Sequence, residues 1–263
     1  MTDTEATCAF AIAGLTLRLS ADNAALIDRF RVRYQAYRVD TDNGLRVHFQ
    51  IKPGTIGLAE YPIEFRDGAL HFTHPSCTGC IDLAQGAAHL CLAVAAPDQA
   101  VEYVLRATTA LLAFDAGGLM LHAAGLARGD RGYAFFGHSG SGKTTVSRVS
   151  TEVRVLNDDL VVLMPNIDWQ IHATPFSNPT QVPPAGPGRV PLAGLLRLVQ
   201  SKQVRIQAMP VAQAAAEVLT SVPIVPLDPQ RMPILLERVL NLVTAVPTSR
   251  LHFLPDDSFW QVI

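Results

Sequence analysis

The sequence lacks several features that would assign it to a class of protein at once. Its 21 basic and 23 acidic side chains nearly cancel, for a formal net charge of −2, so nothing draws it overall to nucleic acid or to an anionic membrane. It has no uninterrupted apolar run of about 18 residues, so we expect no membrane-spanning helix. Residues 1–5 include no basic residue, so the N-terminus lacks the basic region followed by an apolar stretch that marks a signal peptide, and we expect no secretion.

Cysteine is also scarce. Four cysteines in 263 residues are too few for a disulfide framework, and they favour reduced thiols and a cytoplasmic location. No internal repeat is visible, so a repeat architecture is not expected. With 49% hydrophobic and 17% charged residues, the chain is instead typical of a compact globular protein large enough to bury a sizeable core.

Lysine is the scarcest charged residue, and one lysine stands in a phosphate-binding motif. The chain has 18 arginines but only three lysines. Lys143 belongs to a stretch that fits G-x-x-x-x-G-K-[ST] at every fixed position, the loop whose backbone N–H groups surround nucleotide phosphates. Its lysine reaches the β- and γ-phosphates, and its last hydroxyl is a ligand for Mg²⁺. We therefore expect nucleotide to bind Gly137, His138, Ser139, Gly140, Ser141, Gly142, Lys143, Thr144 and Thr145.

The surroundings of the motif are those it requires. Residues 132–136 are apolar and aromatic and predict a buried strand, and the residues after Thr144 predict the start of a helix, whose dipole would add to the attraction for phosphate. A chance Gly/Ser-rich turn is the alternative, but it would not explain the strand and helix on either side.

An acidic pair follows the next apolar strand. The strand expected at residues 153–156 ends in Asn157-Asp158-Asp159, where a phosphate-loop fold needs carboxylates. One of the two can hold Mg²⁺ or Mn²⁺ together with Thr144, while the other accepts a proton from an attacking hydroxyl. The sequence does not say which aspartate has which role, and a turn between two strands is the structural alternative.

The rest of the chain predicts a mixed α/β protein with two parts. Residues 1–97 read mostly as strands of an antiparallel N-terminal domain, and residues 98–263 as the nucleotide-binding domain, opening with a helix over 98–115. Residues 174–191 contain six prolines and predict a loop. Helical patterns follow at 192–200, 211–220 and 228–246, before a closing strand at 250–254.

Beyond the motif, the region 119–165 resembles the HPr kinase/phosphorylase family, whose fold is related to phosphoenolpyruvate carboxykinase. That family has a histidine-bearing strand, a glycine-containing turn, a second strand, a G-x-S-G-x-G-K-[ST] loop and an Asp-Asp pair. This chain has Leu121-His122, Gly129 and Gly132, Phe135-Phe136, the loop, and Asp158-Asp159 in the same order. The resemblance implies that His122 lies near the phosphates, that Thr144 and one aspartate hold the metal, and that the other aspartate is the base.

The sequence differs from the HPr kinase family at positions that bear on which molecule accepts the phosphoryl group. His138 stands where the family loop usually has an acidic residue, the Arg-Gly-rich signature of true HPr kinases is absent, and the N-terminal part does not match. The chain is more similar to HPr-kinase-like proteins associated with modified-peptide biosynthesis, a likeness that its closing residues 246–251 share. The resemblance thus implies an ATP-dependent kinase acting on a serine or other hydroxyl of a peptide or protein.

Other readings stay open at this point. A free amino acid or another small hydroxyl compound is an alternative acceptor, and a non-catalytic nucleotide-dependent switch is an alternative function. The sequence lacks an Asn-Lys-x-Asp element for guanine and a Leu-Ser-Gly-Gly-Gln transporter signature. It leaves the oligomeric state open, a homo-oligomer included.

Two smaller patterns concern the N-terminal part. His71, His74, Cys77 and Cys80 are four potential zinc ligands within ten residues, although structural zinc sites more often use two pairs separated by a longer span, so a plain hairpin is the favoured interpretation. The basic residues at 29–38 indicate a solvated edge, with an acidic peptide as the alternative partner.

Overall fold

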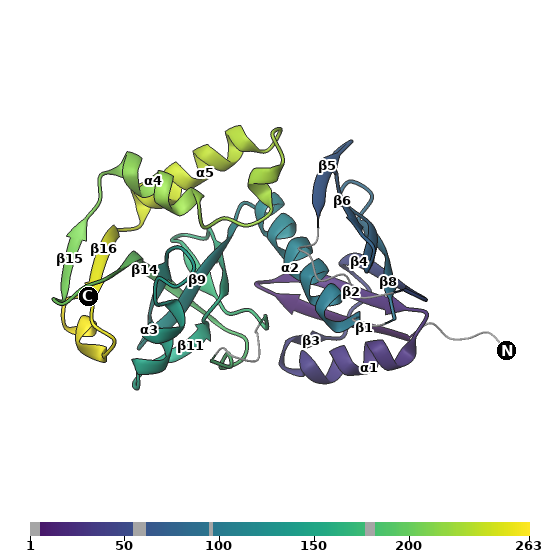
Figure 1. The fold of residues 1–263 in the computed structure, drawn as a ribbon, viewed down its shortest axis with the longest axis horizontal. Helices are drawn as coiled ribbons and strands as arrows, with labels where there is room; N and C mark the ends of the chain where they lie inside the picture. The colour runs from purple at the N-terminus through teal and green to yellow at the C-terminus, as the bar shows by residue number, and fades with distance from the viewer. Residues whose placement is uncertain (1–5, 55–61, 95–96, 177–181) are drawn as a thin grey trace. The chain divides into compact units, whose positions relative to one another are not determined.

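The chain folds into two compact units, 1–112 and 113–263 (Figure 1). The computed structural model describes residues 6–54, 62–94, 97–176 and 182–263. It confirms a mixed α/β protein, with one large sheet in each unit. The division lies within helix α2 (Pro97–Asp115), whereas the sequence places a domain boundary at 97–98; which domain owns this helix stays a prediction.

An eight-stranded sheet forms most of the first unit. Its order is β3-β1-β2-β4-β8-β7-β6-β5. The strands have apolar residues on one face and polar residues on the other, the alternation expected of a sheet with one solvated face. Their bounds are β1 (Ala6–Ile12), β2 (Leu15–Ala21), β3 (Arg38–Val39), β4 (Leu45–Lys52), β5 (Ile63–Arg66), β6 (Ala69–His74), β7 (Cys77–Asp82) and β8 (Ala87–Ala93).

The expectation of a purely antiparallel N-terminal sheet is wrong at two positions. Strand β4 runs parallel to both of its neighbours, β2 and β8. Between β2 and β4 the chain makes helix α1 (Ala24–Arg33) and the short helix η1 (Gln35–Tyr37), and such a long crossover lets two strands run in the same direction. Tight hairpins enforce antiparallel pairing only where two strands follow one another directly.

Helix α1 packs its apolar side onto this sheet through Leu26, Ile27 and Phe30, and the Asn23 side chain caps its first turn. The arginines of α1 are engaged within the unit: Arg29 pairs with Asp98, Arg31 with Asp28, and Arg33 with the buried Glu102. These contacts support the solvated edge for the basic cluster.

The sheet of the second unit contains a closed ring of strands. Its order is β10-β9-β12-β13-β14-β16-β15, with β11 beside β9, and a parallel pairing of β10 with β14 closes five strands on themselves. The bounds are β9 (Leu119–Arg128), β10 (Arg131–Phe136), β11 (Arg154–Asn157), β12 (Leu160–Met164), β13 (Gln170–His172), β14 (Arg189–Gln200), β15 (Arg205–Ala208) and β16 (Thr248–Phe253).

The helix expected at residues 192–200 is wrong, because these residues belong to β14. An apolar run of this length suits a buried helix or a buried strand, and periodicity alone does not separate the two. The neighbouring strands decide in favour of a strand, because β14 pairs in parallel with β10 on one side and with β16 on the other. The middle of the strand, from Leu192 to Leu198, is buried or half-buried, and its two ends are exposed.

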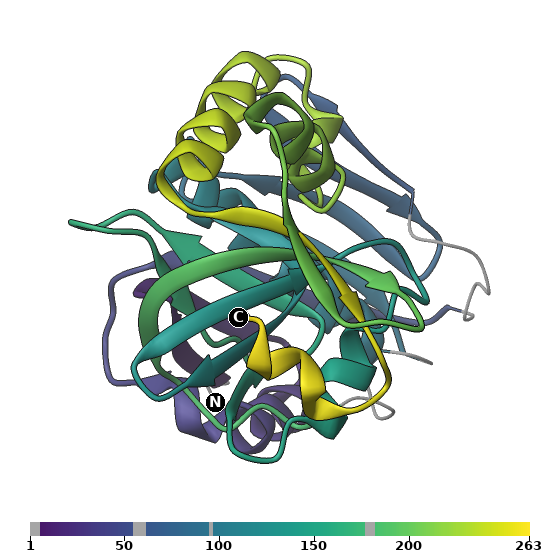
Figure 2. The same ribbon diagram turned by 90° about the vertical axis from the view of Figure 1, so that its left-hand side faces the viewer.

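The helices of this unit are α3 (Lys143–Val149), α4 (Val211–Leu219) and α5 (Met232–Ala245), with short turns η2 (Val225–Leu227) and η3 (Asp257–Gln261). The helical patterns at 211–220 and 228–246 are thus confirmed in kind. Figure 2 shows α4 and α5 above the sheet and η3 below it. An aromatic core lies on the η3 side and packs on α3 through Val146; its aromatic members are Tyr133, Phe135, Phe253, Phe259 and Trp260.

Candidate nucleotide site

The phosphate-loop sequence forms a tight loop between β10 and α3, as its pattern predicts. Gly137, Gly140 and Gly142 all have positive φ, a conformation that glycine adopts at little cost. At Gly142, with φ of 109°, a Cβ atom would also lie 2.4 Å from the Phe253 ring. Helix α3 has only seven residues, so its dipole is short, and the positive groups at the site are the loop amides and Lys143.

Lys143 is folded into its own loop. Its ammonium donates to the carbonyl oxygens of Gly137 at 3.0 Å and His138 at 3.2 Å. Only 8% of the residue is exposed, and this burial lowers the pKa of the ammonium, an effect that nearby Asp159 opposes. The lysine thus holds the loop in shape, and a phosphate group that enters the loop can take over its hydrogen bonds.

The acidic pair is positioned by the buried Asn157 at the end of β11. Its side-chain oxygen accepts from the N–H groups of Asp159 at 2.7 Å and Leu160 at 2.9 Å. Its side-chain nitrogen donates to the carbonyl oxygens of Thr174 and Phe176. One side chain therefore fixes both the turn that carries the aspartates and the start of the proline-rich segment. Part of that segment, 177–181, lies outside the described residues.

Asp158 is almost fully buried and only half satisfied. Its Oδ2 atom accepts from the Val182 N–H at 3.0 Å, while Oδ1 is buried without a hydrogen-bond partner. Burial raises the pKa of this carboxyl, and hydrogen bonding from the Val182 N–H and, less strongly, from the Thr144 hydroxyl opposes the rise in part. An unpartnered buried carboxylate oxygen costs stability, so its presence points to a ligand that satisfies it.

Asp159 contacts His122, the histidine singled out by the family resemblance. The register of β9 with β12 sets Leu160 opposite His122, and His122 Nδ1 lies 3.1 Å from Asp159 Oδ1. The His122 backbone N–H donates to the Ser221 carbonyl oxygen at 2.7 Å. The histidine side chain is 44% exposed while that of Asp159 is 7% exposed, so His122 is the accessible member of the pair.

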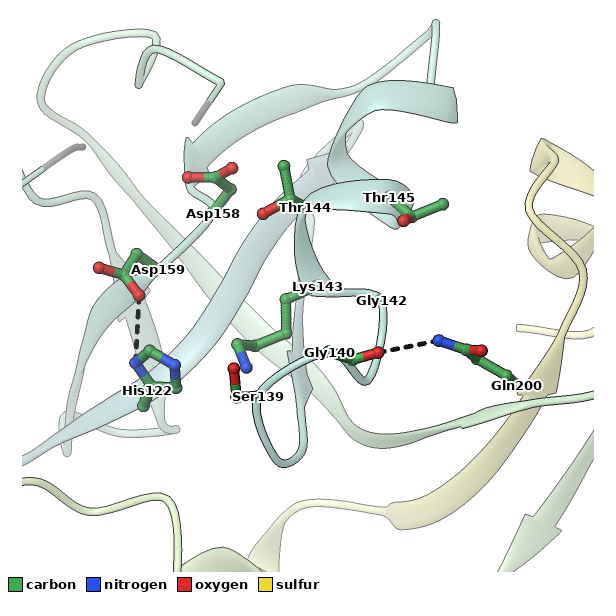
Figure 3. Close-up of a pocket in the computed structure, with 10 residues that line it drawn as sticks. All are labelled: His122, Ser139, Gly140, Gly142, Lys143, Thr144, Thr145, Asp158, Asp159 and Gln200. Carbon is green, nitrogen blue, oxygen red and sulfur yellow. Dashed lines mark hydrogen bonds and ion pairs between the residues drawn. The ribbon is translucent and has the colours of Figure 1, made fainter. Parts of the chain in front are cut away.

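These groups line one cavity of about 360 Å³. Figure 3 shows Asp158, Asp159 and His122 on one side, Lys143 and Ser139 in the middle, and Gln200 with Gly140 at the opposite end. Thr144 faces the space between Lys143 and Asp158. The cavity therefore has an acidic end with a histidine, a centre with a lysine, and an amide at its far end.

Most of the residues predicted for the site meet in this cavity, including all four predicted catalytic residues. Gly137, His138 and Ser141 line neighbouring hollows instead. Sequence reasoning missed Gln200, whose side-chain N–H donates to the Gly140 carbonyl oxygen at 2.8 Å. No local signal identifies it, because its place beside the loop depends on β14 running parallel to β10.

The oxygen donors fit Mg²⁺. Asp158 Oδ1 is a buried polar atom without a hydrogen-bond partner, and Thr144 lines the same cavity. Ser141 Oγ also lacks a partner, but it lines the neighbouring hollow. Hard oxygen ligands such as those of Asp158 and Thr144 suit Mg²⁺, which is held by one or two protein groups plus substrate phosphates. The described residues contain no cluster of three or more His, Cys, Asp or Glu side chains that could hold a metal alone.

No helix among the described residues is long and apolar enough to cross a membrane. No model of a known protein family matches the chain, and neither does any curated protein sequence.

Proposed function

We propose that this protein is an ATP-dependent phosphotransferase of the HPr-kinase-like type, which transfers the γ-phosphoryl group to a serine or other hydroxyl of a peptide or protein. One observation carries the proposal: the His122–Asp159 pair and the half-satisfied Asp158 lie in the same cavity as Lys143. A loop that only binds nucleotide does not require two buried carboxylates and a histidine beside the lysine.

The phosphates of the donor would lie in the loop, beside Lys143. Lys143 and the loop amides neutralise charge on the transferring group. Thr144 and Asp158 would hold Mg²⁺, which supplies further charge neutralisation at the phosphates when bound. This assignment uses the buried Asp158 oxygen that has no protein partner.

Asp159 is then the proton acceptor. It lies beside His122 at the acidic end of the cavity that also contains Lys143, where it would accept the proton of an incoming hydroxyl. His122 orients the carboxylate through the 3.1 Å contact and adds positive charge near the transferred group when it is protonated. We therefore assign Asp158 to the metal and Asp159 to the proton, a choice that the sequence leaves open.

Two variants with matched controls test the proposal. Lys143→Ala should lose nearly all transfer, while Lys202→Ala, which removes an exposed lysine, should not. Asp159→Asn should still bind Mg-ATP but transfer at least about 10²-fold more slowly, the low end for a general base, with Asp168→Asn as the control on an exposed carboxylate.

The assay incubates the protein with Mg-ATP and candidate peptides and detects an added phosphate by mass spectrometry, with nucleotide binding followed by calorimetry. Wild-type transfer in Lys143→Ala would refute the kinase assignment. Product on free serine but on no peptide would move the acceptor to a small molecule. Nucleotide hydrolysis without any acceptor product, together with a nucleotide-dependent partner, would favour the switch.

A further inference from the structure

The solvated face of the N-terminal sheet carries a continuous row of potential metal ligands. The row crosses six neighbouring strands at one level, and each member is the direct register partner of the next. In order from β5 to β2 it consists of Glu64, His71, Cys80, His89, His48 and Ser20. Three of the eight histidines in the chain are thus adjacent in space, although up to 41 positions separate them in the sequence.

The side chains of this row point away from the core. Successive side chains of a strand alternate between the two faces of a sheet. Leu70 and Phe72 flank His71, Ile81 follows Cys80, and Leu90 follows His89, and all four of these apolar residues are buried. His71, Cys80 and His89 are partly or fully exposed, so they lie on the opposite, solvated face.

This arrangement explains the zinc-like spacing seen in the sequence. His74 and Cys77 are buried at the hairpin between β6 and β7, where His74 Nδ1 accepts from the Ser76 N–H. They cannot converge with His71 and Cys80 on one ion, so the four residues do not form a single site. His71 and Cys80, whose side chains point outward, instead lie in one row with His89 on β8.

The lengths of the side chains favour three central residues of the row, His71, Cys80 and His89, as the ligands. Residues directly opposite one another have Cβ atoms about 4.5–5.5 Å apart. The short Cys80 side chain stands between two long imidazoles, so an ion bound above the thiolate at about 2.3 Å can be reached by both histidines at about 2.0–2.1 Å. The present rotamers of the described residues bring no three donors onto one point, so the imidazoles must rotate toward Cys80 on binding.

A further imidazole lies next to the trio. The His48 ring centre lies 6.1 Å from that of His89, and His48 Nδ1 is 2.9 Å from the Ser20 hydroxyl. The Ser20 contact holds His48, which is the neighbour of a proposed ligand and not itself one of the three. The cysteines are all free thiols, so Cys80 is not committed to a disulfide.

We propose that His71, Cys80 and His89 form a site for a borderline-soft divalent transition metal, Zn²⁺ foremost, with a fourth position left to water or another ligand. Nitrogen and sulfur donors select this class over Mg²⁺ and Ca²⁺, which prefer oxygen. The site lies in the first unit and is independent of the proposed phosphotransfer.

Co²⁺ is the probe, because its bond to a thiolate gives a charge-transfer absorption band. The reduced full-length protein is titrated with Co²⁺, and Zn²⁺ is then added to displace it. We expect one equivalent to bind with this band, Cys80→Ala to abolish the band, and His71→Ala or His89→Ala to weaken binding at least about tenfold.

Two controls separate this site from others. Cys91→Ala removes an outward thiol from the next row, opposite Thr78, and His252→Ala removes a histidine from the second unit. Both should bind Co²⁺ as the wild type does, and circular dichroism checks that each variant is folded. Absence of the band in the wild type, its persistence in Cys80→Ala, or its equal loss in a folded Cys91→Ala would overturn the proposal.

Discussion

Replacing Asp158 with Asn should stabilise the ligand-free protein while it removes its response to Mg²⁺. The carboxyl is 1% exposed, and one of its oxygens has no partner. Burial raises the pKa of Asp158 above its ordinary value of 3.8. A carboxyl whose pKa is raised by folding binds its proton more tightly in the folded state, so its ionisation costs stability above the raised pKa.

The magnitude follows from that unsatisfied group. A buried polar atom without a partner costs about 1–3 kcal/mol, and more when it is charged. Asn keeps the size of the side chain and can still accept from the Val182 N–H, but its NH2 group then takes the place of the unpartnered oxygen, so only the extra cost of the charge is recovered. We expect the unfolding free energy of the ligand-free protein to rise by about 1 kcal/mol, with Tm rising about 2–4 °C.

Thermal unfolding with and without Mg-ATP measures both effects. A ligand at 100 times its Kd stabilises the folded state by about 2.7 kcal/mol. The wild type should therefore be the less stable protein without ligand and the more stable one with Mg-ATP. Lowering the pH from above the raised pKa of Asp158 toward 3.8 should shrink the difference between the ligand-free proteins, because protonation removes the buried charge in the wild type.

The test depends on which of the two proteins melts at the higher temperature. A ligand-free Asp158→Asn protein that melts below the wild type would show that the carboxylate is a structural group. A variant that keeps the full Mg²⁺-dependent shift would exclude Asp158 from the metal site. Asp168→Asn, on the exposed hairpin, controls for a general effect of removing one negative charge.

Two further predictions concern the architecture around the loop. Gly142→Ala should lower the free energy of unfolding, measured in urea, by about 1–3 kcal/mol, because its φ is positive and its Cβ would meet the Phe253 ring. The loss should be smaller in a Phe253→Leu background, and an equal loss there would exclude the clash. Asn157→Ala should cost about 3 kcal/mol or more, because it removes four hydrogen bonds from a buried turn. The exposed Asn166→Ala is its control, and losses within about 0.5 kcal/mol of each other would contradict the role of Asn157.

Local signals predicted much of the fold and of the candidate site. The helix at 98–115 and the buried strand at 132–136 agree with α2 and β10, because a regular apolar pattern marks each of them. A tight loop forms at the glycine-rich residues because these glycines permit the positive φ values that the turn needs, while phosphate binding there stays a prediction.

Features that depend on pairing between distant segments were not predicted. The direction of β4 and the strand character of β14 are set by neighbours that are remote in the sequence. Gln200 reaches the loop only because of β14, and His48 and His89 join Cys80 only through the order of the N-terminal sheet. The sequence of one segment does not predict these pairings, because its apolar periodicity shows which face of a strand is buried and not which strand lies beside it.

The pairing of β9 with β12 also determines where this chain can change length. His122 and Asp159 meet because Leu160 is set opposite His122, and adding or deleting one residue in either strand would turn every following side chain to the other face. Such changes would separate the two groups even if the strands still formed. The exposed hairpin at 165–168, in contrast, lies beyond the last paired residue of β12. Insertions there would leave the spacing of the pair unchanged, which makes this hairpin the natural position for an added tag or an inserted domain.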